Sequence, residues 1–314
     1  MNTNEMIPTE NTALTKAEKK ALKKQRRLEK KLDRQEGRRV KTVIPMNAFM
    51  PFIMKKRNDA CNFFEDKFEV TAVEDYIYKK RAEGWKGFGL MHFLVAAYTR
   101  AIAEYPGVNR FIRGQRIYAR HNMEVVLVVK RSMKLNEEET CVKFFPKQSD
   151  TAEEVYRKIV STVDAAIANQ NSDFDKAARI LASFPRFLLR FAVNVLHFLD
   201  YYHMIPRFLT KLSPFHGSMI ITSMGSLGIP PVYHHIYNFG NLPLFISYGK
   251  VEKVYQLNAD ASVSEKHLLP LKIVCDERIC DGHHYASFFK AIRYYFAHPD
   301  SLDVPPAEVK KDIP

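Results

Sequence analysis

The sequence predicts an α+β fold, in which helices pack on a mixed β-sheet. Apolar runs of strand length are interspersed with longer segments of helical periodicity, without the regular strand–helix alternation typical of a parallel sheet. The 314 residues are 46% apolar and include 22 Phe and 15 Tyr, enough for a sizeable core. We therefore expect a folded protein rather than a disordered one.

Positive charge is concentrated near the N-terminus. Residues 15–41 hold 13 Lys/Arg and 4 Asp/Glu, a net charge of +9, whereas residues 43–314 carry only +6. We expect a tail over residues 1–42, disordered at first and then a basic helix that stops at Gly37. This helix is either solvated or contacts an anionic polymer or a membrane surface. No Gly-rich phosphate loop or RNA-binding signature accompanies it, which argues against a nucleic-acid-binding domain.

One domain is expected over residues 43–314. Helical patterns cover residues 89–106 and 151–170, and the second opens with the capping box Thr151/Glu154. The last strand is followed by a tight Asp281–Gly282 turn and then by an amphipathic helix. The predicted strands begin at Phe68, Arg116, Cys141, Ser218, Leu242 and Leu271. The apolar residues of the last helix are Tyr285, Phe288, Phe289, Ile292 and Phe296.

Residues 184–212 form an aromatic helical insertion, FPRFLLRFAVNVLHFLDYYHMIPRFLTKL, interrupted by Pro185 and Pro206. Cations alternate with its aromatic residues. Two interpretations are open: a helical hairpin packed on its own domain or on a neighbouring subunit, or an interfacial membrane helix.

The cysteines and the N-terminal residues indicate a cytoplasmic protein, either free or peripheral to a membrane. Cys61, Cys141, Cys275 and Cys280 lack CxxC spacing, and we expect reduced thiols, with Cys275 and Cys280 in the core rather than acting as nucleophiles. The N-terminus has no signal-peptide core, and no run approaches 18 uninterrupted apolar residues.

Three segments together resemble the catalytic domain of dihydrolipoyl acyltransferases, whose superfamily includes chloramphenicol acetyltransferase. LVAAYTRAIAEYPGVNRFI is similar to an early helix of that family. HGSMIITSMGSLGIPPVYHHIYNFGNLPLFISYGKVEK is similar to its hydroxyl-bearing strand, Gly-x-x-Gly turn, Pro-containing loop and closing strand. CDERICDGHHYASFF resembles its signature, a His followed by three residues and Asp-Gly. The resemblance runs from about residue 43 to the end.

The resemblance implies a chloramphenicol acetyltransferase-like fold, a homotrimer, and a channel between subunits that takes coenzyme A or another acyl-thioester. In the family, the His removes a thiol proton and a Ser or Thr hydroxyl stabilises the oxyanion. The hydroxyl position corresponds to Thr222, with Ser223 beside it. Asp281 and Gly282 match the structural Asp-Gly, and Arg57 is the candidate partner of Asp281. No lipoyl domain accompanies the segment, so membership of a dehydrogenase complex is not implied.

Glu277 occupies the position of the family's catalytic His. An imidazole near pKa 6.5 lies about 2 units below a thiol, whereas a carboxylate near 4.3 lies about 4 units below. The substitution therefore adds roughly 3 kcal/mol to proton removal, on the order of a hundredfold in rate. Glu277 is either a base whose pKa Asp276 and Asp281 raise and Arg278 lowers, or a surface or salt-bridged carboxylate without a catalytic role.

Two histidine pairs are candidate replacement bases; the alternative for His283 and His284 is a packed or exposed position at the helix start without a catalytic role. His283 and His284 begin the last helix, where the positive end of the helix dipole favours neutral imidazole. His234 and His235 lie in the loop PPVYHHIYNFGN. No acidic or third histidine neighbour accompanies this pair in sequence, so we predict no metal site.

Three function classes follow. The first is an acyltransferase that uses a CoA-thioester or pantetheine-linked donor carried by a partner, with activity altered or lost through Glu277. The second is a non-catalytic trimeric scaffold, a pseudoenzyme in which Glu277→His would create activity. The third is a protein that binds a membrane surface or an anionic polymer through the basic tail and the aromatic insertion.

Overall fold

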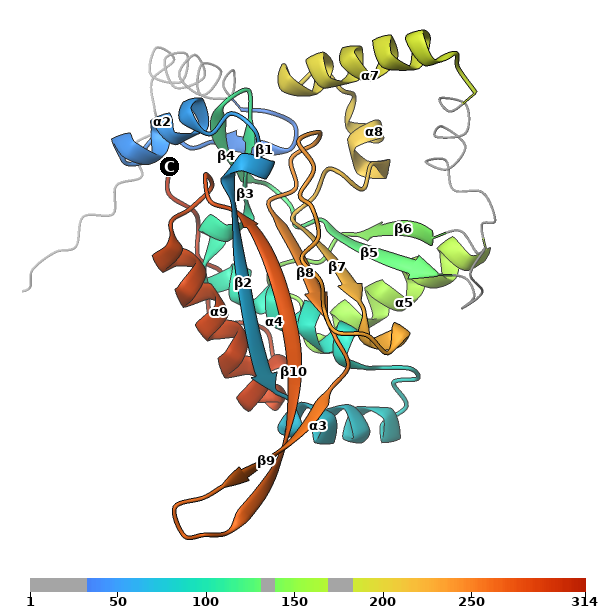
Figure 1. Cartoon of the computed structure of the whole chain (residues 1–314), viewed down its shortest axis with the longest axis vertical. Coiled ribbons are helices and arrows are strands. Elements are labelled where there is room, and N and C mark those ends of the chain that lie inside the picture. The colour runs from blue at the N-terminus through green and yellow to red at the C-terminus, as the bar shows by residue number, and fades with distance from the viewer. Residues whose placement is uncertain (1–32, 131–138, 169–182) are drawn as a thin grey trace, which may run out of the picture.

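The computed structural model describes residues 33–130, 139–168 and 183–314 (Figure 1). The disordered segment and most of the basic helix predicted for the tail lie outside this range. The larger sheet contains the strands β2 (Cys61–Glu69), β10 (Val263–Asp276), β8 (Leu244–Tyr248), β7 (Met219–Ser223), β5 (Val125–Lys130) and β6 (Glu139–Phe144), in that order. Strand β9 (Glu252–Leu257) pairs with the first half of β10. β7 is parallel to β5 and β8, and the other pairs are antiparallel, which confirms the predicted mixed sheet.

A smaller antiparallel sheet joins β1 (Gly37–Arg39), β4 (Arg116–Arg120) and β3 (Arg110–Arg113). β1 belongs to the range predicted as tail, so ordered structure begins before residue 43. Gly37 is required there because a Cβ atom would lie only 2.5 Å from the carbonyl oxygen of Ala119. A single glycine thus permits the close pairing of β1 with β4.

Three long helices cover one face of the larger sheet: α4 (Leu90–Glu104), α5 (Ala152–Ala168) and α9 (Gly282–Ala297) (Figure 1). α4 is buried almost all round, as expected for a helix enclosed between the sheet and its two neighbours. The predicted apolar residues of α9 are all buried. The capping box of α5 is confirmed, because Thr151 N–H donates to Glu154 and Glu154 N–H donates to Thr151 Oγ1.

Side-chain alternation divides the central strands between two faces. On β8, Leu244, Ile246 and Tyr248 enter the core beneath the helices, whereas Phe245 belongs to a small cluster on the opposite face. Ile220 of β7 belongs to that second cluster. Because successive residues alternate, Thr222 lies on the same face as Ile220. We call this face, which α4, α5 and α9 do not cover, the open face of the sheet.

Four predicted strands differ from the structure. The strand predicted from Leu271 is the last part of β10, which begins at Val263, and the segment predicted as one strand from Leu242 divides into β8 and β9. The strand predicted from Phe68 begins at Cys61, and α3 (Thr71–Ala82) starts where the strand was expected to continue. β2 carries Glu65, Asp66 and Lys67 at the edge of the sheet, and these charges hide its apolar period. The segment predicted as one strand from Arg116 divides into β4 and β5, which belong to different sheets.

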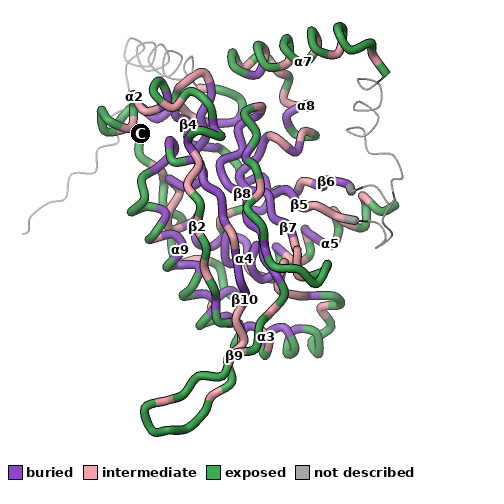
Figure 2. The backbone as a smooth tube through the Cα atoms, viewed as in Figure 1, coloured by how far each residue is buried: buried purple, intermediate pink, exposed green. Residues whose placement is uncertain are grey.

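The aromatic insertion forms α7 (Arg186–Tyr201) and the short α8 (Arg207–Leu212). α7 has only one buried residue, Asp200, so most of the helix is not packed on its own domain. At the same end of the molecule lies α2 (Pro45–Ile53), whose only buried residue is Pro51 (Figure 2). Within the described residues, no helix is long and apolar enough to cross a membrane.

Candidate active site

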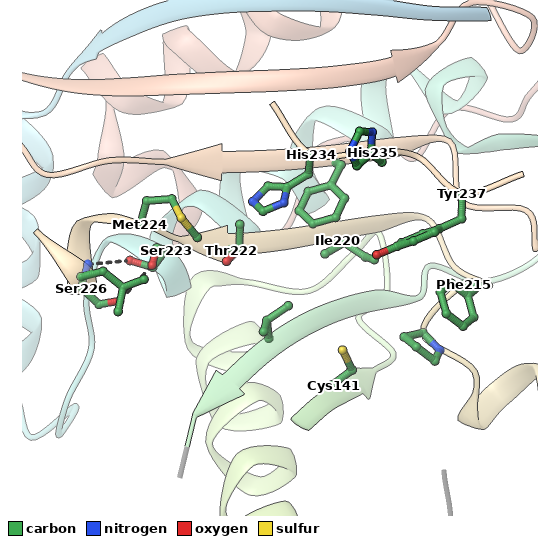
Figure 3. Close-up of a pocket in the computed structure, with 14 residues that line it drawn as sticks. Cys141, Phe215, Ile220, Thr222, Ser223, Met224, Ser226, His234, His235 and Tyr237 are labelled. Carbon is green, nitrogen blue, oxygen red and sulfur yellow. Dashed lines mark hydrogen bonds between the residues drawn. The ribbon is translucent and has the colours of Figure 1, made fainter. Parts of the chain in front are cut away.

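A cavity of about 560 Å³ lies against the open face of the sheet, a volume typical of small-molecule sites. β7 supplies Thr222 and Ser223, and the loop between β7 and β8 supplies His234 and His235 (Figure 3). The remaining lining is largely apolar and includes Val128, Ile220, Leu227 and Phe245. A mostly apolar pocket with a few polar groups gathered from separate segments is suited to an acyl group and its reacting carbonyl.

Thr222 lies near the end of β7, with its position fixed by parallel pairing with Ser247. The residue is 7% exposed, and its side chain lines the cavity. Among the described residues, none forms a hydrogen bond with the Thr222 hydroxyl. This hydroxyl is therefore available to a ligand in the cavity.

The turn after β7 depends on two glycines. A Cβ on Gly225 would approach the carbonyl oxygen of Gly249 to 2.5 Å, and Gly228 has φ +74°, in the left-handed region. Ser223 stabilises the same turn, since its Oγ accepts from Ser226 N–H and its side chain is hydrogen-bonded to Tyr248. The Ser223 hydroxyl is thus used to hold the turn, whereas the Thr222 hydroxyl forms no hydrogen bond with the described residues.

His234 lies over the open face next to the Thr222 position. Its ring stacks on Phe245 with centroids 4.4 Å apart and an interplanar angle of 14°. Phe245 pairs with Ile220, and Ile220 precedes Thr222 by two residues on the same face of the sheet. The loop is also held by Val232 N–H, which donates to Ser247 Oγ at 3.2 Å. Stacking on a neighbouring strand therefore brings an imidazole to the same wall of the cavity as Thr222.

Glu277 lies elsewhere in the chain. It follows the last residue of β10, its N–H donates to the carbonyl of Ala60, and its side chain is exposed. β10 is antiparallel to β8, and Lys272 is opposite Ser247, the partner of Thr222. Five residues of strand then separate the level of Thr222 from Glu277, about 16 Å along the sheet. A single chain does not bring Glu277 to the cavity.

His283 and His284 begin α9, as predicted, but neither lines the cavity. The tight turn precedes Asp281 rather than including it, and Asp281 is the N-cap of α9. Its carboxylate accepts from His284 N–H at 2.9 Å and lies 3.0 Å from His284 Nδ1. The bond from the backbone N–H of His284 lowers the pKa of Asp281, and the two imidazoles lower it further.

The predicted partnership of Arg57 with Asp281 is wrong. Arg57 Nε lies 3.3 Å from Asp276 Oδ2, and its two terminal nitrogens donate to the carbonyls of Tyr237 and Gly240. Arg57 is buried, whereas Asp281 is exposed at the helix start. Burial of Arg57, opposed by Asp276, lowers its pKa to about 10.

Asp276 and Arg278 form a buried ion pair that was not predicted from the sequence. Arg278 Nε and Nη2 donate to the two carboxylate oxygens of Asp276 at 2.8 and 2.7 Å. Arg278 Nη1 also donates to the carbonyl of Met54. The Asp-x-Arg spacing at the end of a strand could have predicted this ion pair. From the sequence, both residues were instead treated only as charges that shift the pKa of Glu277. Asp276 instead secures the end of β10.

The thiols behave as expected for core residues. Cys275 and Cys280 are buried, and burial raises the pKa of Cys280 to about 12. Burial likewise raises the pKa of Cys275 well above its ordinary value. A thiol that resists ionisation is a poor nucleophile. In the described ranges, no group of three His, Cys, Asp or Glu is arranged to hold a metal ion.

No family model matches the sequence, and no curated protein matches it. Solved structures do match the fold. A probable dihydrolipoamide acetyltransferase from Listeria monocytogenes aligns with a TM-score of 0.53 and 16% identity, over 82% of this chain and 95% of that one. Dihydrolipoamide acetyltransferase from Azotobacter vinelandii aligns with a TM-score of 0.50 and 13% identity. This alignment covers 82% of this chain and 88% of that one.

A truncated catalytic core of the 2-oxoacid dehydrogenase multienzyme complex from Thermoplasma acidophilum gives a TM-score of 0.52 and 12% identity. The alignment covers 83% of this chain and 99% of that core. These likenesses confirm the fold that the three sequence segments predicted.

Proposed function

We propose that this chain, which has the fold of dihydrolipoamide acetyltransferase catalytic cores, transfers an acyl group from coenzyme A or another pantetheine-linked thioester. The observation that carries the proposal is the cavity in which the unengaged hydroxyl of Thr222 and the imidazole of His234 share one wall. An acyl-carrying partner is the proposed source of the donor.

Each residue has a distinct role in the proposed reaction. His234 accepts the proton of the attacking thiol, alcohol or amine, which then adds to the acyl carbonyl. Thr222 Oγ1 donates a hydrogen bond to the oxyanion of the tetrahedral intermediate. The intermediate collapses with loss of the donor thiolate, which takes up the proton that His234 accepted. The apolar lining excludes water and holds the acyl chain.

Assembly is part of the proposal. Phe63 and Tyr233 are exposed and in edge-to-face contact at 5.4 Å, and Leu227, Ile229 and Val232 are exposed in the loop beside the cavity. A homotrimer would cover this apolar rim and could bring Glu277, His283 or His284 of one copy towards the cavity of another. Light scattering should then give three times the 36.4 kDa of one chain.

The test compares substitutions in an assay of free thiol released from acetyl-CoA. Thr222→Val removes the hydroxyl at nearly constant volume and should lower kcat about a hundredfold, whereas Thr222→Ser should retain activity. His234→Gln should lower kcat at least a hundredfold, and His235→Gln serves as the neighbouring control. Full activity in both Thr222→Val and His234→Gln would refute the proposed roles.

Glu277→Gln separates two versions of the site. If His234 is the base, this variant should keep nearly full activity. If Glu277→Gln abolishes activity and mixing it with Thr222→Val chains restores part of it, the site is shared between copies and Glu277 is the base.

The alternative is a non-catalytic trimeric scaffold, favoured by the exposure of Glu277 at the position where the family has its catalytic His. It predicts no binding of coenzyme A or acetyl-CoA by titration calorimetry and no thiol release. Activity gained by Glu277→His in an otherwise inactive protein would support this alternative.

A further inference from the structure

α7 exposes an apolar stripe that the described residues of its own chain do not cover. Phe187, Phe191 and Phe198 are 77%, 66% and 58% exposed, and Leu188 and Val195 lie between them on the same stripe. Arg186, Arg190 and His197 lie along one edge of this stripe, and Asn194 lies within it, seven residues after Phe187. The helix is therefore strongly amphipathic, and part of its apolar side faces outward.

α2 shows the same exposure. Its outward apolar residues, together with the residue that precedes it, are Ile44, Met46, Phe49, Phe52 and Ile53. A buried helix would place such residues in the core, but only Pro51 of α2 is buried. The two helices lie at the same end of the molecule (Figures 1 and 2). Their exposed aromatic and aliphatic side chains are therefore presented at that end.

One residue, Gln115, is hydrogen-bonded to both helices. Gln115, in the turn between β3 and β4, donates to the carbonyl of Pro51 in α2 at 3.4 Å. The hydroxyl of Tyr201, the last residue of α7, donates to the side-chain oxygen of Gln115 at 2.7 Å. Asp200 anchors α7 further, since it lies 2.9 Å from Arg113 and accepts from Gly240 N–H. We call the exposed apolar residues of α2 and α7 the α2–α7 surface.

The exposed charges around this surface are mostly positive. Arg186 and Arg190 are exposed on α7, and Lys55 and Lys56 are exposed just after α2. α2 contains no acidic residue, and Asp200, the acidic residue of α7, is buried and paired. Asp59, which follows these lysines, is exposed, so the four cations outnumber one acid. Exposed aromatic side chains flanked by an excess of cations match the interface of an anionic bilayer.

The β9–β10 hairpin provides a contrast. It also exposes apolar residues, Tyr255, Leu257 and Val263, at the opposite end of the molecule (Figure 1). Its charges are mixed, however, because Lys253 pairs with Glu265, and Lys67 of β2 pairs with Glu252. Exposed apolar residues and an excess of cations coincide on the α2–α7 surface and not on the hairpin.

We propose that the α2–α7 surface docks on the headgroup region of an anionic phospholipid bilayer, with α7 lying in the plane of the membrane. The 16 residues of α7 span about 24 Å, long enough to lie along the interface. A two-fold contact between two such surfaces would bring their cations together without exposed acids on either helix to pair with them. The charge pattern therefore favours lipid over a second copy of the same surface.

Flotation of the full chain with vesicles tests the proposal. The anionic vesicles contain phosphatidylcholine with roughly 30% phosphatidylglycerol, as in a strongly anionic membrane. The protein should float with these vesicles and float more weakly with vesicles of pure phosphatidylcholine. The variant Phe187→Ser/Phe191→Ser/Phe198→Ser should lower partitioning about tenfold or more. The hairpin variant Leu257→Ser/Val263→Ser, the matched control, should bind like the original chain.

A second measurement separates apolar insertion from attraction of the basic tail. In Phe191→Trp, brominated lipids should quench the added fluorescence, and in Leu257→Trp they should leave it unchanged. Equal flotation of the α7 and hairpin variants, or no quenching at position 191, would overturn the proposal. If the α7 variant instead lowers the mass of the particle without affecting flotation, this surface contacts another copy of the chain.

Discussion

Asp276 and Glu277 are adjacent residues in opposite surroundings. Asp276 is 1% exposed and is bonded by two arginines, whereas the side chain of Glu277 is exposed and makes no hydrogen bond or ion pair within the described part of the chain. The strand end thus places a structural carboxylate inside and leaves the next one in solvent. A charge that compensates two buried guanidiniums matters far more to stability than an exposed one.

We expect Asp276→Asn to lower the free energy of unfolding by about 3–5 kcal/mol, because Arg57 and Arg278 would remain buried without a counter-charge. Urea denaturation monitored by circular dichroism measures the loss. The neighbouring control, Glu277→Gln, should stay within about 0.5 kcal/mol of the original chain. Equal losses in the two variants would contradict the assigned roles.

The candidate site could be predicted from sequence only in part. The hydroxyl of Thr222 was predicted because its strand and its Gly-x-x-Gly turn are local patterns. The choice among four histidines depended on tertiary contacts, since His234 reaches the cavity by stacking on Phe245. The pairing of Arg57 with Asp276 joins residues more than 200 positions apart, which no local pattern encodes.

At the scale of elements, helices with clear periods and caps were predicted closely. α4 and α5 agree with the expected ranges to within a few residues, and α5 begins at its predicted capping box. The edge strand β2 was predicted poorly, because it needs an apolar side chain mainly on its inner face, whereas the other edge strand, β6, was predicted to within two residues. The exposed aromatic residues of α7 were visible in the sequence, but the exposure of their stripe required the structure.

Thr151→Ala should lower the free energy of unfolding by about 1 kcal/mol, because one N-terminal N–H of α5 would lose its side-chain acceptor. Chemical denaturation measures this change. Ser161→Ala, on the exposed part of the same helix, should change it by less than about 0.5 kcal/mol. If the two variants behave alike, the capping box does not stabilise α5.

At the scale of the whole molecule, buried titratable groups should make the fold sensitive to acid. Burial lowers the pKa of His92 to about 4, and burial together with Arg113 and Arg34 lowers the pKa of His203 to about 3. Burial raises the pKa of Asp200, but His216 and Arg113 outweigh this effect and lower it to about 2. As the pH falls, the two histidines lower the free energy of unfolding first. Asp200 lowers it only when the pH falls below the ordinary carboxyl pKa of 3.8.

The free energy of unfolding should fall by a few kcal/mol between pH 6.5 and 4. In this range His92 and His203 bind protons in the unfolded chain but stay neutral in the folded one. Thermal unfolding at several pH values measures this slope. The double variant His92→Gln/His203→Asn should flatten it, and Asn suits the left-handed φ of 59° at position 203. The exposed His121→Gln should keep the slope, and a double variant as acid-sensitive as the original chain would contradict this explanation.

The β9–β10 hairpin and the α2–α7 surface occupy opposite ends of the long axis (Figure 1). The two ends of the molecule therefore have different surfaces. With α7 resting on lipid, the hairpin becomes the point farthest from the bilayer, directed into the aqueous phase. A protease or antibody directed at the hairpin tip would then reach it equally well on vesicles and in solution. The cavity, located between the two ends, would face sideways, accessible to a donor that diffuses along the membrane or arrives from solution.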